Sequence, residues 1–520
     1  MKTGFNRLTN RLTLWIGRVL LLGAVLAVFA ACDRREVVVP EPGPPPAAPV
    51  TDRAQAEPGE DGPIPLTPAA PNTVTVRVTA APTPTRVPPD STATTYTVRP
   101  GDTLLRIAGL YATTTETLMR INGLTNPDKI VVGQELQVTL NTELVGPATA
   151  LVPDSDVVLG PGYSTFDLAE EIARHPGLLS HYEEVVNGRT LTGVEIVSLV
   201  ARQYSVGPRV LLALLELRGG WLSNLTPDAG QQVYPLGYTR QTHYAGLYYQ
   251  LMQAANGLNI GFYGWWLDDL WLIQTMDGAH IQFSPELNAG TAGVQKVLAD
   301  TSASYDTWIA DMDRFQEIYA NLFGDPFGYA VEPLIHPETE NAPLVLPWAK
   351  GETWYYTGGP HPGWGSLGAF SAVDFVTDEV HLGCAISTGW VTASAPGLIV
   401  MSEDGMVLQD LDGDGDLGTG WVILYMHIAS QNRVAAGTWV EAGDRIGHPS
   451  CEGGVSSASH LHLARRLNGV WIPTDHSQWP MLLSGWVPIP GDKAYSGTLV
   501  RDEEVRRSCE CWEAVNAVTH

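Results

Sequence analysis

The chain has 520 residues, 44% of them apolar, which is enough for about three domains with cores of their own. It carries 30 Lys and Arg against 56 Asp and Glu, a net charge of −26. This balance argues against a nucleic-acid-binding protein, which would show a basic patch. Five cysteines are too few for a disulfide-dense scaffold but allow a bridge or two.

The N-terminus has the pattern of an export signal that ends at a cysteine. Four basic residues precede an uncharged run at residues 19–31, which is shorter than the ~20 residues of a spanning helix. The run ends in two alanines directly before Cys32. This ending resembles a bacterial lipoprotein signal, with Phe29 in place of the usual Leu. The resemblance implies a signal peptide at 1–32 and a lipidated Cys32, which would anchor the exported protein to the cell membrane, facing the wall or periplasm. A plain cleaved signal and an uncleaved anchor are the alternatives.

Residues 33–94 are dominated by Pro, Ala, Thr and Val. Such a composition cannot bury a core, and proline-rich chains adopt extended polyproline II conformations. The segment could span up to ~190 Å at ~3.1 Å per residue. We therefore expect a disordered tether that acts as a spacer through the cell envelope.

A small module follows at residues 95–140. Asp102 is expected to cap the first of two short helices, and Asn122-Gly123 is expected to end the second with a left-handed residue. The motifs VRPGDTL, IAGLY, INGL and VVGQEL, in this βααβ order, resemble the LysM domain. The resemblance implies binding to the N-acetylglucosamine backbone of peptidoglycan; a folded module without sugar affinity is the alternative. The predicted elements are a strand at 96–98, helices at 104–111 and 115–121, and a strand at 136–138.

The middle segment, 160–335, is predicted to be mainly α-helical. Apolar residues recur at helical spacing on both sides of a break at 205–207, and Pro208 suits the first turn of the second helix. Glu216 ends an apolar run there. The run LLALLE faintly resembles the lysozyme-like fold of lytic transglycosylases, in which such a glutamate is the general acid, although Leu217 stands where that family has a serine. The other interpretation pairs Glu216 with an arginine at the helix end.

Four fragments of the C-terminal third, at 345–480, carry residues suited to metal chemistry. In chain order they are Gly359–Pro362, Ala372–Phe375, Tyr425–His427 and Ser459–His462. Residues i and i+2 of a strand point to one face, so His460 and His462 should share a face, as should Tyr425 and His427 on another strand. A catalytic zinc takes three protein ligands from His, Asp or Glu and keeps one position open. We expect an antiparallel all-β domain whose strands bring these fragments into one groove, followed by a tail at 481–520.

The four fragments, in this order and with GTWVEAGDRIG before the last, resemble the lysostaphin-like (β-lytic) zinc endopeptidases of peptidoglycan. The gap of 13 from His361 to Asp374 is similar to that of the β-lytic branch. The resemblance implies that His361, Asp374 and His462 hold one zinc ion. It makes His427 and His460 the catalytic pair that do not bind the metal, and leaves open which of them is the base.

The remaining features of this domain are its cysteines and an acidic loop. Cys384 and Cys451 flank the predicted site and are expected to pair; Cys509 and Cys511 would pair with each other or stay free. A DLDGDGD run resembles the first half of an EF-hand loop, but Trp421 stands where the closing glutamate would be. Calcium binding there is a prediction to be tested. The acidic residues of this loop are Asp410, Asp412, Asp414 and Asp416. Two further histidines, His381 and His448, lie outside the four fragments and are expected to be structural.

Taken together, the sequence predicts a multidomain cell-wall hydrolase that cuts peptide cross-links of peptidoglycan and is held at the wall by its LysM domain and lipid anchor. The main alternative is a non-catalytic peptidoglycan-binding lipoprotein that activates another hydrolase. Relatives of that kind typically lose zinc ligands, and this chain keeps all of them. A third possibility adds a glycosidase based on Glu216. The sequence does not identify the bond that is cut.

Overall fold

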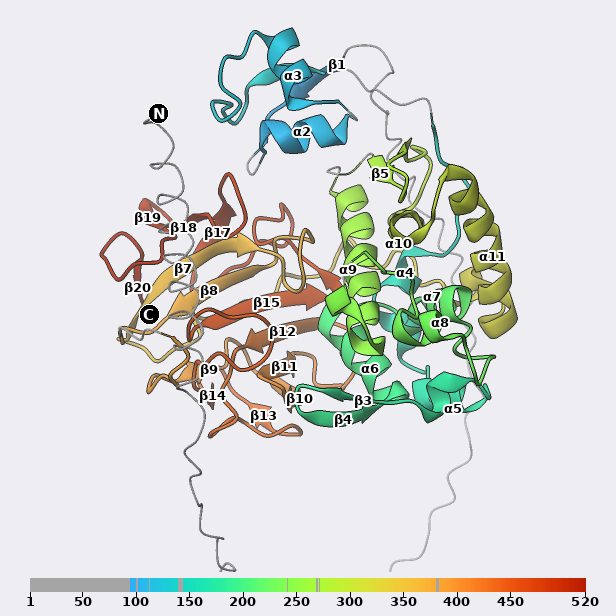
Figure 1. Ribbon diagram of the computed structural model, residues 1–520. Helices are drawn as coiled ribbons and strands as arrows, with labels where there is room; N and C mark the ends of the chain where they lie inside the picture. The colour runs from blue at the N-terminus through green and yellow to red at the C-terminus, as the bar shows by residue number, and fades with distance from the viewer. Residues whose placement is uncertain are drawn as a thin grey trace, which may run out of the picture. The chain divides into compact units, whose positions relative to one another are not determined.

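The computed structural model describes residues 94–99, 102–111, 113–138, 144–240, 242–267, 270, 272–379 and 383–520 (Figure 1). The predicted signal peptide, Cys32, almost all of the predicted tether and His381 lie outside these residues. Within the described residues, no helix has the length and apolar character needed to cross a membrane.

The first folded module has the predicted βααβ order. Gly123 ends the second helix in the left-handed conformation, with φ of 64°, as expected. The predicted cap of the first helix is wrong by one residue, because the Thr103 side chain accepts from the Arg106 amide. Asp102 instead accepts from the Tyr96 hydroxyl at 2.8 Å, which ties the turn to the sheet. The elements are β1 (Thr94–Thr97), α2 (Leu104–Leu110), α3 (Thr115–Asn122) and β2 (Glu135–Val138), with β1 and β2 antiparallel.

The middle domain is mainly helical, as predicted. Its helix α7 is buried on nearly every side, which is typical of a helix at the centre of a bundle. Helices α9 and α10 approach closely where a Cβ on Gly261 would lie 2.6 Å from the Ala292 carbonyl oxygen, so no larger residue fits there. The helices are α4 (Asp154–Val157), α5 (Leu168–Ala173), α6 (Gly193–Tyr204), α7 (Pro208–Gly219), α8 (Ala229–Val233), α9 (Leu247–Trp266), α10 (Ala289–Thr301) and α11 (Tyr305–Phe323). These helices are connected by short 3-10 turns and by two β-hairpins. The turns are η1 (Pro161–Tyr163), η2 (Leu178–His181), η3 (Thr242–Tyr244) and η4 (Pro326–Tyr329). The hairpins are β3 (Glu183–Val186) with β4 (Arg189–Thr192), and β5 (Leu272–Gln274) with β6 (His280–Gln282).

The predicted break between α6 and α7 is confirmed. Helix α6 begins with a capping box between Thr192 and Glu195, which satisfies two amides that a helix start leaves free. It ends at Ser205, whose φ of 55° is left-handed. Pro208 then occupies the first turn of α7, where its missing N–H costs nothing.

The C-terminal domain is built on a nine-stranded antiparallel sheet of order β13-β10-β11-β12-β15-β8-β7-β20, with β16 paired to β15. Strands β12 and β15 are buried along their whole length, which explains the continuous apolar run WVILYM. The strands are β7 (Thr353–His361), β8 (Ala372–Val376), β10 (Gly397–Glu403), β11 (Met406–Asp410), β12 (Trp421–Met426), β13 (Trp439–Val440), β15 (Leu461–Leu467), β16 (Val470–Trp471) and β20 (Ala517–Thr519), beside a separate pair of β9 (Val391–Thr392) and β14 (Arg445–Gly447).

The residues predicted as a tail are folded. Strands β17 (Val487–Pro490), β18 (Gly497–Arg501) and β19 (Glu504–Arg507) form a three-stranded sheet. The last strand, β20, pairs with β7 at the edge of the main sheet. The C-terminal residues therefore complete the sheet that carries the predicted site.

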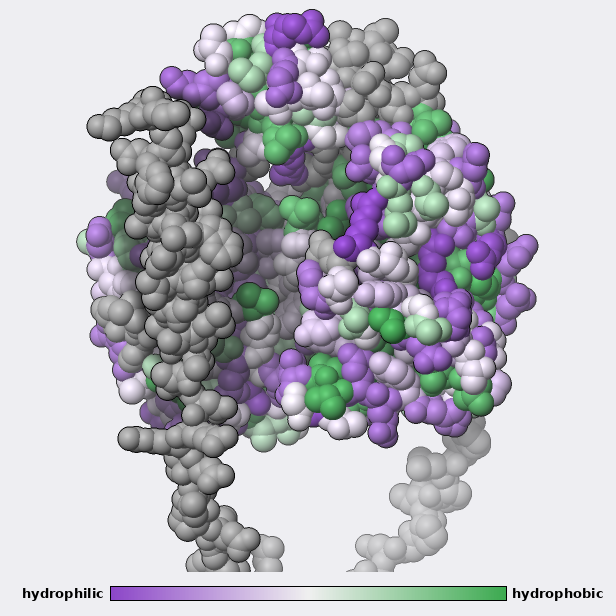
Figure 2. Space-filling model, in the orientation of Figure 1, coloured by the Kyte–Doolittle hydropathy of each residue, from purple (hydrophilic) through white to green (hydrophobic). Residues whose placement is uncertain are grey.

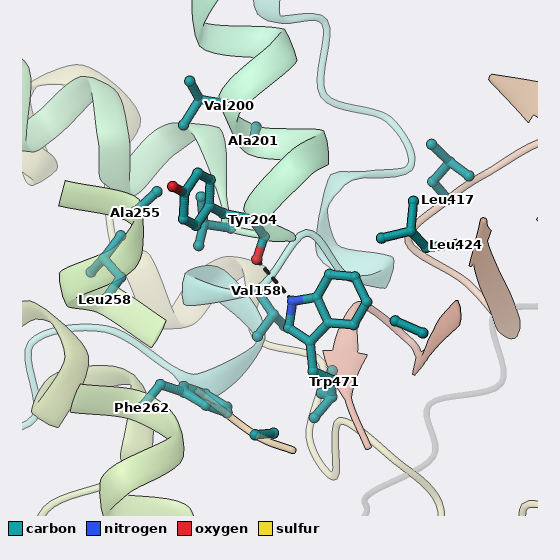
Figure 3. Close-up of a cluster of buried hydrophobic side chains, with 14 of the residues drawn as sticks. Val158, Val200, Ala201, Tyr204, Ala255, Leu258, Phe262, Leu417, Leu424 and Trp471 are labelled. Atoms are coloured by element: carbon teal, nitrogen blue, oxygen red, sulfur yellow. Dashed lines mark hydrogen bonds between the residues drawn. The ribbon is translucent and has the colours of Figure 1, made fainter. Parts of the chain in front are cut away.

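The middle and C-terminal domains share one buried apolar cluster. Figure 3 shows Trp471 of the sheet domain beside Val158 and Tyr204 of the middle domain. The indole N–H of Trp471 donates to the Tyr204 carbonyl at 3.1 Å, and its amide donates to the Tyr263 hydroxyl at 2.8 Å. A fragment cut between the two domains would therefore expose Trp471.

On the face drawn in Figure 2, hydrophobic residues form mostly small, separate patches among hydrophilic ones.

The four cysteines of the described residues form two disulfides. Cys384 is bonded to Cys451, as expected for the loops flanking the site. Cys509 is bonded to Cys511, which settles the alternative that the sequence left open.

Candidate active site

Three side chains that the sequence singles out converge on neighbouring strands. His361 ends β7, Asp374 lies in β8 and His462 lies in β15 opposite Asp374 in the register. His361 Nε2 is 2.9 Å from His462 Nδ1, and Asp374 Oδ1 is 3.3 Å and 3.2 Å from these two nitrogens. All three residues are buried. The structure thus brings these atoms, far apart in sequence, within bonding distance of a common point.

Hydrogen bonds behind the two imidazoles determine which nitrogen faces this point. His361 Nδ1 donates to the Gly359 carbonyl at 2.8 Å, and His462 Nε2 donates to the Gly363 carbonyl at 3.0 Å. Because a carbonyl oxygen can only accept, the neutral rings present lone pairs at His361 Nε2 and His462 Nδ1. Asp374 Oδ1 has no hydrogen-bond donor among the residues that the structure describes. Three acceptors that face one another without a proton call for a cation.

The spacing of these atoms suits zinc. Ligands about 2.0–2.1 Å from a tetrahedral zinc lie about 3.3 Å from one another, close to the distances in this site.

The other two histidines of the motifs lie beside this trio. The rings of His427 and His460 are 4.4 Å apart between centroids, and His460 Nε2 lies 3.8 Å from Asp374 Oδ1. His427 Nδ1 donates to the Glu452 carbonyl at 3.1 Å, which leaves its Nε2 free. Burial, followed by the nearby His460, lowers the pKa of His427 to about 3. His427 is therefore neutral over the whole physiological range.

The route by which His427 reaches the site differs from the predicted one. Strand β12 ends at Met426, and His427 has a left-handed φ of 63°. Tyr425 points elsewhere: its buried hydroxyl accepts from the Ser394 amide at 2.7 Å. The predicted shared face of Tyr425 and His427 is wrong because the backbone turns between them.

Tyr495 belongs to this site and was missed by the sequence analysis. Its ring stacks on His361, with centroids 4.1 Å apart and planes at 21°. The Gly359 amide donates to the Tyr495 carbonyl at 2.8 Å, and Tyr495 itself has a left-handed φ of 68°. The residue lies in the segment predicted as a tail, where no pattern in the sequence marks it. Its side chain is 57% exposed and so forms part of the rim.

The other candidate residues lie apart from the site. Among the described residues, no arginine forms an ion pair with Glu216. It accepts from the Leu222 amide at 2.8 Å and from Ser223, while Arg218 pairs with Asp311 at 2.6 Å. These bonds make Glu216 a cap for the turn after α7. His448 Nδ1 donates to the Gly389 carbonyl at 2.8 Å.

The acidic loop groups three of its four aspartates. Carboxylate oxygens of Asp410, Asp412 and Asp414 lie within 4.8 Å of one another, and burial raises the pKa of Asp410 to about 6. Asp416 instead accepts from the Gly418 amide at 2.8 Å. Calcium binding stays a prediction.

Two family descriptions match parts of the chain: residues 96–139 match the LysM domain, and residues 150–334 match the N-terminal domain of LasA. Protease LasA from Pseudomonas aeruginosa PAO1 is 25% identical over 358 residues, which are 64% of this chain and 78% of that protein. Over this stretch the chain is similar to protease LasA, and it also matches the LysM domain. Protease LasA of strain UCBPP-PA14 is 26% identical over 287 residues, which are 52% of this chain and 65% of that protein.

These matches test the sequence predictions. The LysM domain is confirmed, and so is the relationship to peptidases. The middle domain matches the N-terminal domain of LasA in the segment for which the sequence offered a lysozyme-like fold. Among solved structures, the M23 metalloprotease pseudoalterin is 23% identical with a TM-score of 0.28 and covers 34% of this chain and 99% of its own. The catalytic domain of lysostaphin from Staphylococcus simulans is 25% identical with a TM-score of 0.17, covering 24% and 90%.

Proposed function

We propose that this LasA-related chain is an exported cell-wall hydrolase, a zinc-dependent endopeptidase that cleaves peptide cross-links of peptidoglycan. The observation that carries the proposal is the convergence of lone pairs from His361, Asp374 and His462 beside two further histidines. These three residues would hold one zinc ion. Bound zinc acts as a Lewis acid, which lowers the pKa of a bound water to ~7 and polarises a carbonyl group.

His427 is our candidate for the general base. It is neutral, and its Nδ1–H is held by the Glu452 carbonyl, so Nε2 can take a proton from the attacking water. His460 faces the same space, since its Nδ1 is bonded to the Ala458 carbonyl at 2.8 Å. When protonated, His460 Nε2 can donate to the oxyanion or to the leaving amine.

The rest of the chain would bring this site to its substrate. The LysM domain would bind the glycan strands, and a lipid on Cys32 would hold the tether at the membrane. Both attachments raise the local concentration of wall peptides at the site. Incorporation of a labelled fatty acid into the wild-type chain, and its loss in Cys32→Ser, tests the anchor. Sedimentation with purified peptidoglycan tests wall binding.

The activity is tested with the full chain and purified peptidoglycan, by following newly freed amino groups. Wild type should release them, and His462→Ala or a zinc chelator should stop the release. His336→Gln, which changes an exposed histidine, is the matched control and should behave as wild type. Mass spectrometry of the fragments then identifies the bond. A folded chain that holds one zinc, sediments with the wall and releases nothing would favour the non-catalytic activator instead.

A further inference from the structure

The two histidines of the candidate metal site are oriented by carbonyl groups in different parts of the fold. The Gly359 carbonyl, which accepts from His361 Nδ1, lies within strand β7. The Gly363 carbonyl, which accepts from His462 Nε2 at 3.0 Å, lies in the loop 362–371 between β7 and β8. The orientation of the His462 ring therefore depends on a segment outside the sheet.

The loop 362–371 has little stiffness of its own. It contains Gly363, Gly365 and Gly368, and its residues 365–367 are exposed to solvent. Glycine restricts the backbone less than any other residue. Contacts from outside the loop are therefore needed to keep the Gly363 carbonyl in one place.

The middle domain supplies such contacts. Asn256 of helix α9 accepts through Oδ1 from the Ser366 amide at 2.8 Å and donates through Nδ2 to Ser366 Oγ at 3.1 Å. The ring of Trp364 lies edge-on to that of Tyr204, the last residue of α6, with centroids 6.2 Å apart. A Cβ on Gly365 would lie 2.5 Å from Asn256 Oδ1 and 2.8 Å from Tyr204 Cε1. The loop therefore lies directly against both helices.

Helix α9 also supports Gly363 from its other side, through the buried interface. A Cβ on Gly363 would lie 2.6 Å from Cε3 of Trp471, whose amide donates to the Tyr263 hydroxyl of α9 at 2.8 Å. Of these two supports, the bonds of Asn256 to Ser366 can be removed without disturbing the buried cluster, because they lie at the surface.

We propose that Asn256 of the middle domain is a positioning residue of the peptidase site, an inference that rests on the zinc site proposed above. By holding Ser366, Asn256 restricts the loop that carries the Gly363 carbonyl. That carbonyl keeps the proton of His462 on Nε2 and the lone pair of Nδ1 toward the metal position. The middle domain thus sets the zinc affinity of a site to which it contributes no ligand.

Competition with a chromophoric chelator tests this role in the full chain. Asn256→Ala removes both bonds to Ser366 and should weaken zinc binding about tenfold, as loss of contacts that orient a ligand does. Asn256→Asp keeps an acceptor for the Ser366 amide and should restore the affinity. Asn224→Ala, which removes an exposed acceptor of the Thr226 amide in the same domain, is the matched control and should bind zinc as wild type does.

Hydrogen exchange of the metal-free chains, followed by mass spectrometry, gives a readout that does not depend on zinc. Peptides covering residues 362–371 should exchange faster in Asn256→Ala than in wild type, because the Ser366 amide loses its acceptor and the loop opens more often. Asn224→Ala should leave the exchange of these peptides unchanged. Should Asn256→Ala fail to fold, Asn256→Leu takes its place with the same expectations, since it keeps the volume and makes neither bond.

Equal zinc affinities of wild type and Asn256→Ala would overturn this inference and leave the proposed function intact. A weaker affinity with unchanged exchange of the loop would also overturn it, because the effect would then not pass through residues 362–371. The same weakening in Asn224→Ala would assign the effect to general loss of stability. A wild-type chain that takes up no zinc would instead overturn the proposed function, and this inference with it.

Discussion

The peptidase sheet and the middle domain bury their charged groups in opposite ways. On the sheet, three acceptor atoms of His361, Asp374 and His462 face one another, and no described residue donates a hydrogen bond to Asp374 Oδ1. In the middle domain, Asp156 is buried as deeply but accepts from Arg209 at 2.9 Å and from two tyrosine hydroxyls. The comparison teaches that unsatisfied lone pairs mark the site that needs a ligand, whereas satisfied ones support the fold.

Of the substitutions that test this comparison, one at Asp374 is expected to have the largest effect. Asp374→Asn removes the charge that faces both imidazole lone pairs, and the amide group would bring a donor into the metal position. We expect the full chain to lose its zinc and all amino-group release while remaining folded. Zinc content by mass spectrometry, circular dichroism and the peptidoglycan assay check the three parts. Retention of stoichiometric zinc would contradict the assignment.

The matched change at Asp156 should act on stability instead. Asp156→Asn leaves the buried Arg209 charge uncompensated, and such a loss costs about 3–5 kcal/mol. Urea unfolding of the full chain should show the lower free energy of unfolding. Zinc content should stay at the wild-type value, since Asp156 is not a ligand. A loss of zinc in a folded Asp156→Asn chain would contradict the view that Asp374 binds the metal whereas Asp156 only stabilises the fold.

Tyr495 tests whether a residue that does not bind the metal helps to hold a metal ligand in place, because its ring stacks on His361. Tyr495→Ala removes the ring stacked on His361 and should weaken zinc affinity about tenfold, as loss of ligand-orienting contacts does. Tyr495→Phe keeps the stack and should keep the affinity. Competition with a chromophoric chelator measures both variants. Equal weakening by Ala and Phe would assign the effect to the hydroxyl rather than to the stack.

His427 should make the metal-free chain sensitive to acid. Its folded pKa is about 3, below the ordinary ~6.5 of an unfolded histidine. The unfolded chain therefore binds the proton first, so this stabilisation is complete above pH ~6.5 and is lost as the pH falls towards 3. With zinc chelated, His427→Gln should flatten the fall of the urea midpoint over that range. His336→Gln should leave the slope unchanged.

The smallest effect is expected at Glu216. Glu216→Gln keeps an acceptor for the Leu222 amide and removes only a charge, so we expect a loss of about 0.5–1.5 kcal/mol in the free energy of unfolding. Release of reducing sugar ends from peptidoglycan should be the same as in wild type. Any sugar release by the wild type that disappears in Glu216→Gln would restore the glycosidase hypothesis.

The sequence predicted those parts of the site that follow from strand periodicity. His460 and His462 stand two apart, and both reach Asp374 as that spacing requires. The same rule failed at His427, because a left-handed backbone at that residue is invisible to an alternation rule. Tyr495 was missed for a related reason, since its position depends on a tertiary contact with β7 and on another left-handed residue.

Helix boundaries were predictable where local chemistry sets them, as at Pro208 and Gly123. The partners of the charged side chains in the middle domain were not predictable. Glu216 accepts from a turn directly after its own helix, while Arg218 reaches Asp311 on α11. Such choices depend on how helices pack, and a single sequence does not encode packing in a local pattern. The folded C-terminal strands were likewise unreadable, because β20 is stabilised by pairing with the distant β7.

The most direct test of the central claim is the peptidoglycan assay on His427→Ala beside the wild type, with zinc content measured on the same samples. The account predicts one zinc per chain in both proteins and loss of amino-group release in His427→Ala alone. Release by the zinc-loaded His427→Ala chain at the wild-type rate would contradict it, because the histidine beside the metal position would then play no part in the chemistry.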